Sequence, residues 1–189
     1  MKRFHWIKDI IEKNNYKTMV EVGTGRGKTA QYLLKTCPSL ILFEIAYYPT
    51  TGYDENSSFK AKRMWKRRIK PYKNRVTILE SPSLLAAENF QEMVDIIFID
   101  ADHSKEKVAE DIIAWLSKIR PGGLMCGHDF DHPKFPGVRE AVTDIFDNNF
   151  SYSIDDDHVW WHYIEAESNK IKDDEAELQP DEGSFDSSE

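Results

Sequence analysis

Short runs of apolar residues alternate along the chain with longer segments in which apolar residues recur at helical spacing. The short runs predict buried strands at 18–22, 40–45, 75–79, 94–99 and 124–127. The longer segments predict helices at 4–13, 28–35, 59–70, 82–90, 105–118 and 137–148. Two further runs, 151–154 and 158–164, predict a closing hairpin. Because strands and helices alternate, we expect an α/β fold with a mostly parallel sheet and one antiparallel strand near its edge.

The run at 94–99 ends abruptly in a cluster of ionisable residues. Asp100, Asp102 and His103 follow it within four positions. In open parallel sheets, ligands bind outside the carboxyl ends of the strands, so this cluster is well placed for chemistry. The alternative is a strand that simply ends in a solvated acidic turn.

A glycine-rich turn, Glu21-Val-Gly-Thr-Gly-Arg-Gly27, joins the first predicted strand to the next helix. Glycines allow positive φ and a close approach of a ligand to the backbone, and the free N–H groups of a helix start attract an anion. The dinucleotide pattern G-x-G-x-x-G would need glycine where Lys28 stands, and the P-loop spacing is absent. The turn therefore favours a nucleoside ligand without a pyrophosphate.

An acidic residue, Glu44, lies near the end of the second predicted strand. A carboxylate in that position can accept hydrogen bonds from both hydroxyls of a ribose. The alternative is an ordinary charge at a strand end. The order and spacing of the glycine turn and Glu44 together favour the ribose.

These motifs, taken in order, resemble those of the class I S-adenosylmethionine-dependent methyltransferases. The resemblance covers residues 15–165 and rests on E-V-G-T-G-R-G, the acid of the second strand, D-I-I-F-I-D-A-D-H, and P-G-G before the fifth strand. The segments F-I-D-A-D-H and G-H-D are similar to those of divalent-metal-dependent O-methyltransferases of small molecules, including the catechol and macrolide-sugar types. The resemblance implies a Rossmann-like seven-stranded sheet of order 3-2-1-4-5-7-6 with strand 7 antiparallel.

The resemblance also implies a site for S-adenosylmethionine. The glycines of the turn would wrap its methionine part, Glu21 would lie near its amino group, and Glu44 would hold the ribose. The segment 80–83 would contact the adenine, although it departs from the acidic or Asn-containing motif usual there. The implied cofactor-binding residues are Glu21, Gly23, Gly25, Gly27, Glu44, Ser81, Ser83 and Asp100.

A metal site is predicted where the fourth and fifth strands end. These strands are expected to be neighbours, which would bring Asp100 beside His128 and Asp129. Two carboxylates and an imidazole can hold one divalent cation. The resembling enzymes have an acidic residue where His128 stands, so Mg²⁺, which prefers oxygen ligands, is less well matched than Mn²⁺ or Fe²⁺. A site without metal is the alternative.

His103 lies where the resembling enzymes carry a Lys or His base, and it is the candidate catalytic residue. A neutral imidazole can take a proton from a hydroxyl at neutral pH, and a nearby cation helps by lowering the pKa of that hydroxyl. The alternative assigns His103 to the start of the following helix and leaves His128 and Asp129 in an ordinary loop.

Charge is distributed unevenly along the chain. The net charge is −8, but residues 173–189 hold eight acidic residues and no Lys or Arg, so the remainder is about neutral. We expect a methyltransferase domain at 1–168 and a disordered acidic tail at 169–189, with a partner-binding tail as the alternative. Cys37 and Cys126 suggest no disulfide framework, and no apolar run reaches the ~20 residues of a membrane span, so a cytoplasmic protein is expected.

A basic segment and two aromatic loops bear on the acceptor. Residues 60–75 contain nine Lys or Arg and no acid, which is typical either of a solvated helix face or of an anion-binding surface. Because the rest of the domain is not basic, an anionic small molecule is favoured over nucleic acid. The loops at 47–53 and 130–136 flank the expected mouth of the site and form either a lid or plain packing.

The sequence thus predicts methyl transfer from S-adenosylmethionine to a hydroxyl of a small molecule or sugar. One alternative is a nucleotide-dependent oxidoreductase, which Lys28 in place of glycine argues against. Another is a non-catalytic cofactor-binding domain with the same fold. A homo-oligomer is left open.

Overall fold

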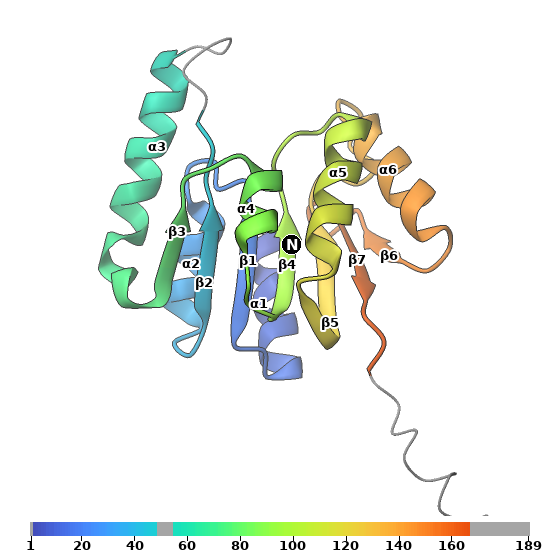
Figure 1. The fold of residues 1–189 in the computed structure, drawn as a ribbon, viewed down its shortest axis with the longest axis horizontal. Helices are drawn as coiled ribbons and strands as arrows, with labels where there is room; N and C mark the ends of the chain where they lie inside the picture. The colour runs from blue at the N-terminus through green and yellow to red at the C-terminus, as the bar shows by residue number, and fades with distance from the viewer. Residues whose placement is uncertain (1, 49–54, 167–189) are drawn as a thin grey trace, which may run out of the picture.

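The computed structural model describes residues 2–48 and 55–166, and within them seven strands form one sheet (Figure 1). The strands are β1 (Thr18–Val22), β2 (Ile41–Ile45), β3 (Val76–Leu79), β4 (Val94–Ile99), β5 (Ile119–Gly127), β6 (Ser151–Ser153) and β7 (Val159–Tyr163). The helices are α1 (Arg3–Asn14), α2 (Lys28–Thr36), α3 (Glu55–Ile69), α4 (Ser83–Asn89), α5 (Lys105–Leu116) and α6 (Pro136–Phe146), with a 3₁₀ helix η1 (Lys70–Arg75) after α3.

The strand order is β3-β2-β1-β4-β5-β7-β6, which confirms the predicted topology. Strand β1 pairs in parallel with β2 and β4, and β4 pairs in parallel with β5. Strand β7 is antiparallel to both β5 and β6. The parallel pairing brings the carboxyl ends of β1, β2, β4 and β5 to one edge of the sheet, where ligands bind in folds of this kind.

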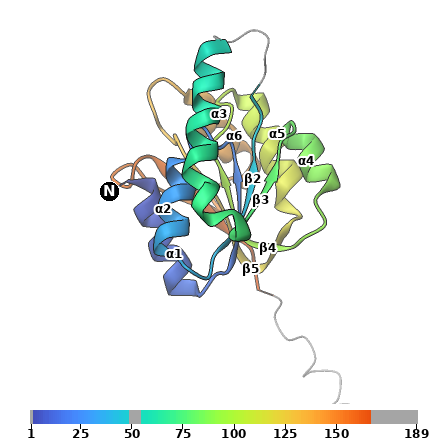
Figure 2. The same cartoon turned by 90° about the vertical axis from the view of Figure 1, so that its left-hand side faces the viewer.

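Helices cover both faces of the sheet (Figure 2). On one face, α1, α2 and α3 pack against Met19 and Leu42 through buried residues that include Trp6, Leu33 and Trp65. On the other face, a second apolar cluster joins α4, α5 and α6 to the side chains of the alternate strand positions. Strand β4 is buried along its whole length, as its continuous apolar run predicts.

Two boundaries differ from the predicted ones. The fifth strand was predicted at 124–127, but β5 already begins at Ile119 and runs through Pro121-Gly-Gly123 with a register shift against β4. Gly123 allows this course, because a Cβ there would lie 2.7 Å from the backbone oxygen of Asp95. Helix α3 begins at Glu55, four residues before the predicted start at residue 59.

Several predictions fall on residues that are not described. These are the acidic tail, the domain boundary at 168, and residues 49–53 of the predicted lid loop. Within the described ranges, none of the helices combines the length and apolar character that crossing a membrane requires. Both cysteines, Cys37 at the end of α2 and Cys126 in β5, are buried free thiols.

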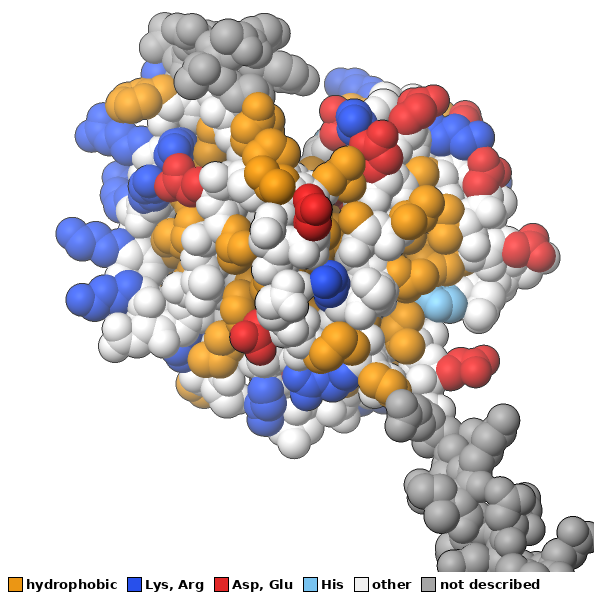
Figure 3. All heavy atoms as spheres, viewed as in Figure 1, with side chains coloured by type: hydrophobic (Ala, Val, Ile, Leu, Met, Phe, Trp, Pro, Cys, Tyr) orange, Lys and Arg blue, Asp and Glu red, His pale blue; other side chains and the backbone are white. Residues whose placement is uncertain are grey.

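The basic segment of α3 and η1 gathers its Lys and Arg side chains along one side of the molecule (Figure 3). Some of these basic side chains form contacts within the protein. Arg75 donates hydrogen bonds to the backbone oxygens of Leu34, Cys37 and Leu40, and so closes the end of α2. Lys62 and Lys66 form ion pairs with Glu80. The anion-binding role of this segment stays a prediction.

Candidate active site at the carboxyl end of the sheet

A cavity of about 1010 Å³ opens over the carboxyl ends of β1, β2 and β4. Its walls come from the glycine turn, the end of β2, the loop before α4, the loop after β4 and the loop before α6. Of the predicted cofactor residues, Gly23, Gly25, Ser81, Ser83 and Asp100 line this cavity. His103, the predicted base, lines it as well.

The glycine turn is held between β2 and β4 by close backbone contacts. Gly23 has φ +90° and a Cβ there would lie 2.3 Å from the backbone oxygen of Asp100, so only glycine fits. Its N–H donates to the backbone oxygen of Ile45 at 3.1 Å. Gly25 has φ +47° and faces open space, which leaves its backbone accessible to a ligand. Gly27 differs: it lies against Trp65 of α3, outside the cavity wall.

Two buried carboxyl groups lie side by side behind the glycine turn. Glu21 of β1 and Glu44 of β2 are partners in the parallel register, and both are almost fully buried. Trp65 donates its Nε1–H to Glu44 Oε2 at 2.8 Å. Burial raises the pKa of Glu44 to about 7. Burial, and then the neighbouring charge of Glu44, raise the pKa of Glu21.

One oxygen of each of these carboxyl groups has no hydrogen-bond partner among the described residues: Oε2 of Glu21 and Oε1 of Glu44. A buried acceptor without a partner is costly, and a ligand that brings hydroxyl or ammonium donors removes that cost. These acceptors, together with the bare glycine turn, fit the amino group and ribose of S-adenosylmethionine. Neither side chain lines the cavity, and the predicted contacts of Glu21 and Glu44 with the cofactor stay predictions.

A further buried acid, which the sequence analysis missed, lies in the cavity wall beside Ser83. Asp111 of α5 lines the cavity, and burial raises its pKa to about 6 although a hydrogen bond with Ser83 lowers it. The Oγ of Ser83 also accepts a hydrogen bond from Trp115 Nε1 at 2.9 Å. The available signal was an acidic residue within the inward-facing positions of the helix at 105–118.

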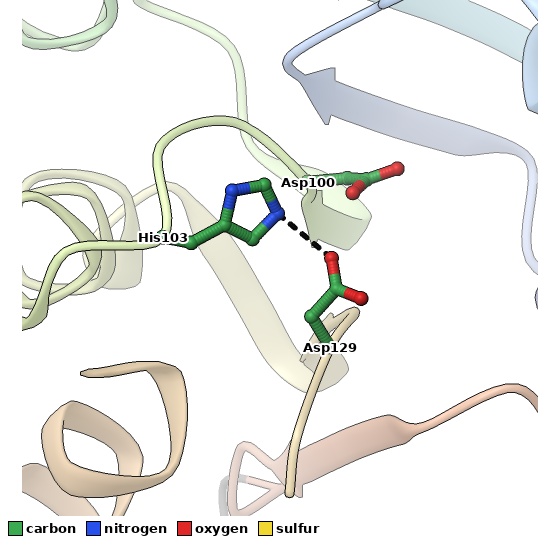
Figure 4. Close-up of side chains that lie close together, drawn as sticks. All are labelled: Asp100, His103 and Asp129. Carbon is green, nitrogen blue, oxygen red and sulfur yellow. Dashed lines mark hydrogen bonds and ion pairs between the residues drawn. The ribbon is translucent and has the colours of Figure 1, made fainter. Parts of the chain in front are cut away.

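Beyond the end of β4, His103 and Asp129 form a hydrogen-bonded pair (Figure 4). His103 Nε2 lies 2.7 Å from Asp129 Oδ2, and Phe135 stacks on the imidazole with 4.1 Å between ring centroids. The hydrogen bond to Asp129 raises the pKa of His103 above its ordinary value of 6.5. The structure therefore brings together two of the predicted residues, from the loops after β4 and after β5.

His128, the first residue after β5, also contacts Asp129. Its Nδ1 lies 2.9 Å from Asp129 Oδ2 and 3.5 Å from Asp100 Oδ1. Burial acts to lower the pKa of His128, but these two carboxylates outweigh it and raise the pKa to about 9. Burial likewise acts to raise the pKa of Asp129, but hydrogen bonds from His103 and His128 hold it well below its usual range.

The sequence analysis also missed Arg3, the first residue of α1. Its guanidinium lies 3.1 Å from Asp100 Oδ2, 3.4 Å from His128 Nε2 and 3.4 Å from Asp157 Oδ2. Asp157 belongs to the turn between β6 and β7. No local pattern marks Arg3 or Asp157, because the fold alone brings the ends of the domain to the strand edge.

The predicted metal ligands lie close together, but each of them already contacts another charged or imidazole side chain of the protein. The predicted ligands were Asp100, His128 and Asp129, but the group whose ligand atoms lie within 4.8 Å of one another consists of Asp100, Asp129 and His103, the predicted base. However, His103 is bonded directly to Asp129, and Arg3 is bonded to Asp100. His128 faces Asp129 with one ring nitrogen and Arg3 with the other. As they stand, these side chains do not fit a divalent ion, and their roles as ligands stay predictions.

Comparison with known proteins gives the family. The family described as "Methyltransferase domain" matches residues 20–130, which is more than half of the chain. No curated protein matches the chain in sequence. The fold is shared with solved structures of low sequence identity.

A Staphylococcus aureus protein provisionally named as a caffeoyl-CoA O-methyltransferase is 18% identical, with a TM-score of 0.67 over 85% of this chain and 82% of that one. An O-methyltransferase from Bacillus cereus in complex with SAH is 17% identical, with a TM-score of 0.64 over 86% of this chain and 80% of that one. At these identities the likeness establishes the fold.

Proposed function

This chain belongs to the methyltransferase domain family, and from that premise we propose that it transfers a methyl group from S-adenosylmethionine to a hydroxyl of a small molecule or sugar. The observation that carries the choice of a hydroxyl is the hydrogen-bonded pair of His103, which lines the cavity, and the buried Asp129 behind it. A hydroxyl must lose its proton as it is methylated, so a positioned base is what this acceptor requires.

The cofactor end of the cavity supports the methyl donor. Gly23 and Gly25 expose backbone at the start of α2, and Glu21 and Glu44 hold unpartnered acceptors behind the turn. When bound, S-adenosylmethionine supplies an electrophilic methyl group. The Methyltransferase domain match spans β1 to β5, and therefore includes every residue of this end.

At the acceptor end, His103 is the proposed base and Asp129 orients it. With its Nε2–H donated to Asp129, the imidazole has its lone pair on Nδ1, which points away from Asp129 (Figure 4). Phe135 stacks on the ring and restricts its rotation. The acceptor hydroxyl would give its proton to Nδ1, and the carboxylate of Asp129 would stabilise the imidazolium that results.

The pH dependence follows from this assignment. Only neutral His103 accepts a proton, and the contact with Asp129 raises its pKa. We therefore expect kcat to rise as the pH increases through a value above 6.5, and to be lowest in acid.

The test uses the purified full chain. Thermal unfolding with S-adenosylhomocysteine at ~100 times its Kd should show about 2.7 kcal/mol of stabilisation, a shift of a few degrees, and NADH should give none. A panel of phenolic and sugar hydroxyl acceptors is then assayed with wild type and His103→Gln. The variant should keep its affinity for S-adenosylhomocysteine and lose about 100-fold or more in kcat.

Each arm separates the alternatives. Stabilisation by NADH alone would favour the oxidoreductase. Binding of S-adenosylhomocysteine without turnover on any acceptor would favour a cofactor-binding domain without catalysis. Turnover by His103→Gln at the wild-type rate, with an unchanged pH profile, would remove His103 as the base.

A further inference from the structure

We propose that Arg3 takes the place predicted for a divalent cation at the acceptor end of the cavity, so that methyl transfer by this chain does not require a metal ion. The inference rests on the proposed function for the reaction, but its structural part concerns ion binding and stands separately. Arg3 is a positioning residue: it acts through Asp100, which lines the cavity, while Arg3 itself does not.

The fold fixes the guanidinium in place. Helix α1 is anchored on the sheet by buried Trp6, Ile7 and Ile11, so its first residue is carried to the ends of β4 and β5. The backbone N–H of Arg3 also donates to Asp157 Oδ2 at 3.4 Å. The Arg3 side chain is only 25% exposed. This is an enclosed cation on a rigid element, unlike the exposed Lys2 beside it.

The contacts of Arg3 are those that a bound cation would make. Its two terminal nitrogens bind Asp100 at 3.1 Å and Asp157 at 3.4 Å, carboxylates from loops far apart in sequence. A guanidinium is permanently charged and offers several donors in one plane, so it can bridge two carboxylates as a metal ion does. Its charge also acts on Glu21, since Arg3 opposes the rise in the pKa of that carboxyl.

A metal ion in the same position would meet this charge. An ion on Asp100 would lie next to the guanidinium, and like charges at such a distance repel strongly inside a protein. It would also have to break the ion pair between Arg3 and Asp100, leaving a partly buried guanidinium with fewer partners. The geometry therefore assigns the positive charge of the acceptor end to the protein itself.

Removing Arg3 should convert this region into a cation site. In Arg3→Ala the carboxylate of Asp100 would lose its guanidinium partner, and Asp100, Asp129 and His103 already place one ligand atom each within 4.8 Å of one another. Two carboxylates and an imidazole can hold one divalent cation, and Mn²⁺ accepts such a mixed set of oxygen and nitrogen ligands. The variant should therefore gain what the wild type lacks.

The experiment measures Mn²⁺ binding by electron paramagnetic resonance and by calorimetry, with the wild type, Arg3→Ala, Arg3→Lys and Lys8→Ala. Lys8 pairs with Glu12 on the same helix and serves as the matched control. We expect Mn²⁺ binding by Arg3→Ala alone. We also expect wild-type turnover to be unchanged by a chelator, and kcat of Arg3→Ala to fall about 10- to 100-fold with KM little altered, as for outer partners of a site. Mn²⁺ should restore part of that loss, and Arg3→Lys should retain most of kcat.

Three outcomes would overturn the inference. The first is stoichiometric binding of Mn²⁺ by the wild type. The second is loss of wild-type turnover on chelation. The third is an Arg3→Ala protein that is folded by circular dichroism and binds no Mn²⁺, as a purely structural role predicts. If Arg3→Ala does not fold, Arg3→Met keeps the apolar stem and replaces it. Ion binding is measured without turnover. The Mn²⁺ binding measurements therefore test the inference even if no methyl acceptor is found.

Discussion

The two ends of the cavity are built in opposite ways. At the cofactor end, Glu21 and Glu44 are buried with raised pKa values, and one oxygen of each has no hydrogen-bond partner among the described residues. At the acceptor end, Asp100 and Asp129 are already paired with cationic or imidazole side chains of the protein. The fold itself pairs the charged groups of the acceptor end, whereas the open acceptors of the cofactor end are those that we propose a ligand would satisfy.

This difference between the two ends shows which polar groups lower the stability of the empty protein in favour of ligand binding. Unsatisfied polar groups destabilise the empty protein and reward the ligand that satisfies them. A satisfied ion-pair network stabilises the empty protein and holds its groups in place for chemistry. Substitutions at the cofactor end should therefore separate stability from binding, whereas substitutions at the acceptor end should chiefly change kcat.

The largest loss of stability is expected on substitution of Gly23. This substitution tests whether the close backbone contacts of the glycine turn stabilise the fold. In Gly23→Ala the added Cβ would overlap the backbone oxygen of Asp100 at a positive φ. We expect a loss of about 2–4 kcal/mol in the free energy of unfolding, measured in urea. Gly25→Ala is the control: its Cβ meets no atom within 4 Å, so the cost should be about 1 kcal/mol from φ alone.

The same pair of variants also sharpens the comparison through binding. Since Gly25 faces the cavity, Gly25→Ala should weaken the binding of S-adenosylhomocysteine, measured by calorimetry, more than it weakens the fold. Equal unfolding free energies for the two variants would contradict the account of Gly23.

An intermediate effect is expected at Glu44. Its pKa in the folded protein is about 7, above the ordinary 4.5, so between these values the folded state holds more protons than the unfolded state. The free energy of unfolding therefore falls as the pH rises from about 4.5 to about 7. Glu44→Gln does not titrate and should be more stable than wild type by about 1–3 kcal/mol at neutral pH and above, with no gain in acid.

Thermal unfolding across the pH range measures this effect, and Glu80→Gln, at an exposed ion pair, is the control. Glu44→Gln should also bind S-adenosylhomocysteine less tightly than wild type. The acceptor end stabilises the protein over a different pH range. The pKa of His128 is about 9 in the folded protein, against an ordinary value of 6.5. Its contribution to the free energy of unfolding is therefore complete below pH 6.5 and is lost as the pH rises through 9. A Glu44→Gln protein that is less stable than wild type at high pH would break the comparison.

The smallest effect is expected in the segment predicted to contact adenine. Ser83 accepts a hydrogen bond from Trp115 and contacts Asp111, whereas the Oγ of Ser81 donates to the neighbouring backbone oxygen of Pro82. Ser83→Ala should lower the free energy of unfolding by about 1 kcal/mol, and Ser81→Ala should leave it nearly unchanged. Urea denaturation distinguishes the two, and equal values would show that the contacts of Ser83 carry no stability.

The sequence predicted those features that depend on residues close together in the chain. The buried run of β4, the glycine turn and the alternation of strands with helices are local patterns, and the resemblance then implied the strand order that is observed. Asp100 could be expected beside His128 because neighbouring parallel strands end at the same edge, and the two side chains lie 3.5 Å apart, whereas the hydrogen bond between His103 and Asp129 was not predicted. The start of β5 was misplaced because Pro-Gly-Gly usually marks a turn, and only the contact of Gly123 with β4 explains its course.

The features that escaped prediction join segments far apart in the chain. Arg3 and Asp157 are 154 positions apart and meet at the strand edge. Trp65 reaches Glu44 from α3, although the spacing of its own helix marks it only as an apolar residue. A single sequence gives no sign of such contacts, because neither partner carries an unusual local pattern.

The reactivity of the two buried cysteine thiols can be used to measure how often different parts of the structure open. Cys126 is completely buried in β5 between β4 and β7, and Cys37 is 5% exposed at the end of α2. A thiol reagent can modify Cys126 only when the middle of the sheet separates, whereas fraying of α2 suffices for Cys37. The two labelling rates would therefore time global and local opening in a single sample, and the cofactor should slow them both.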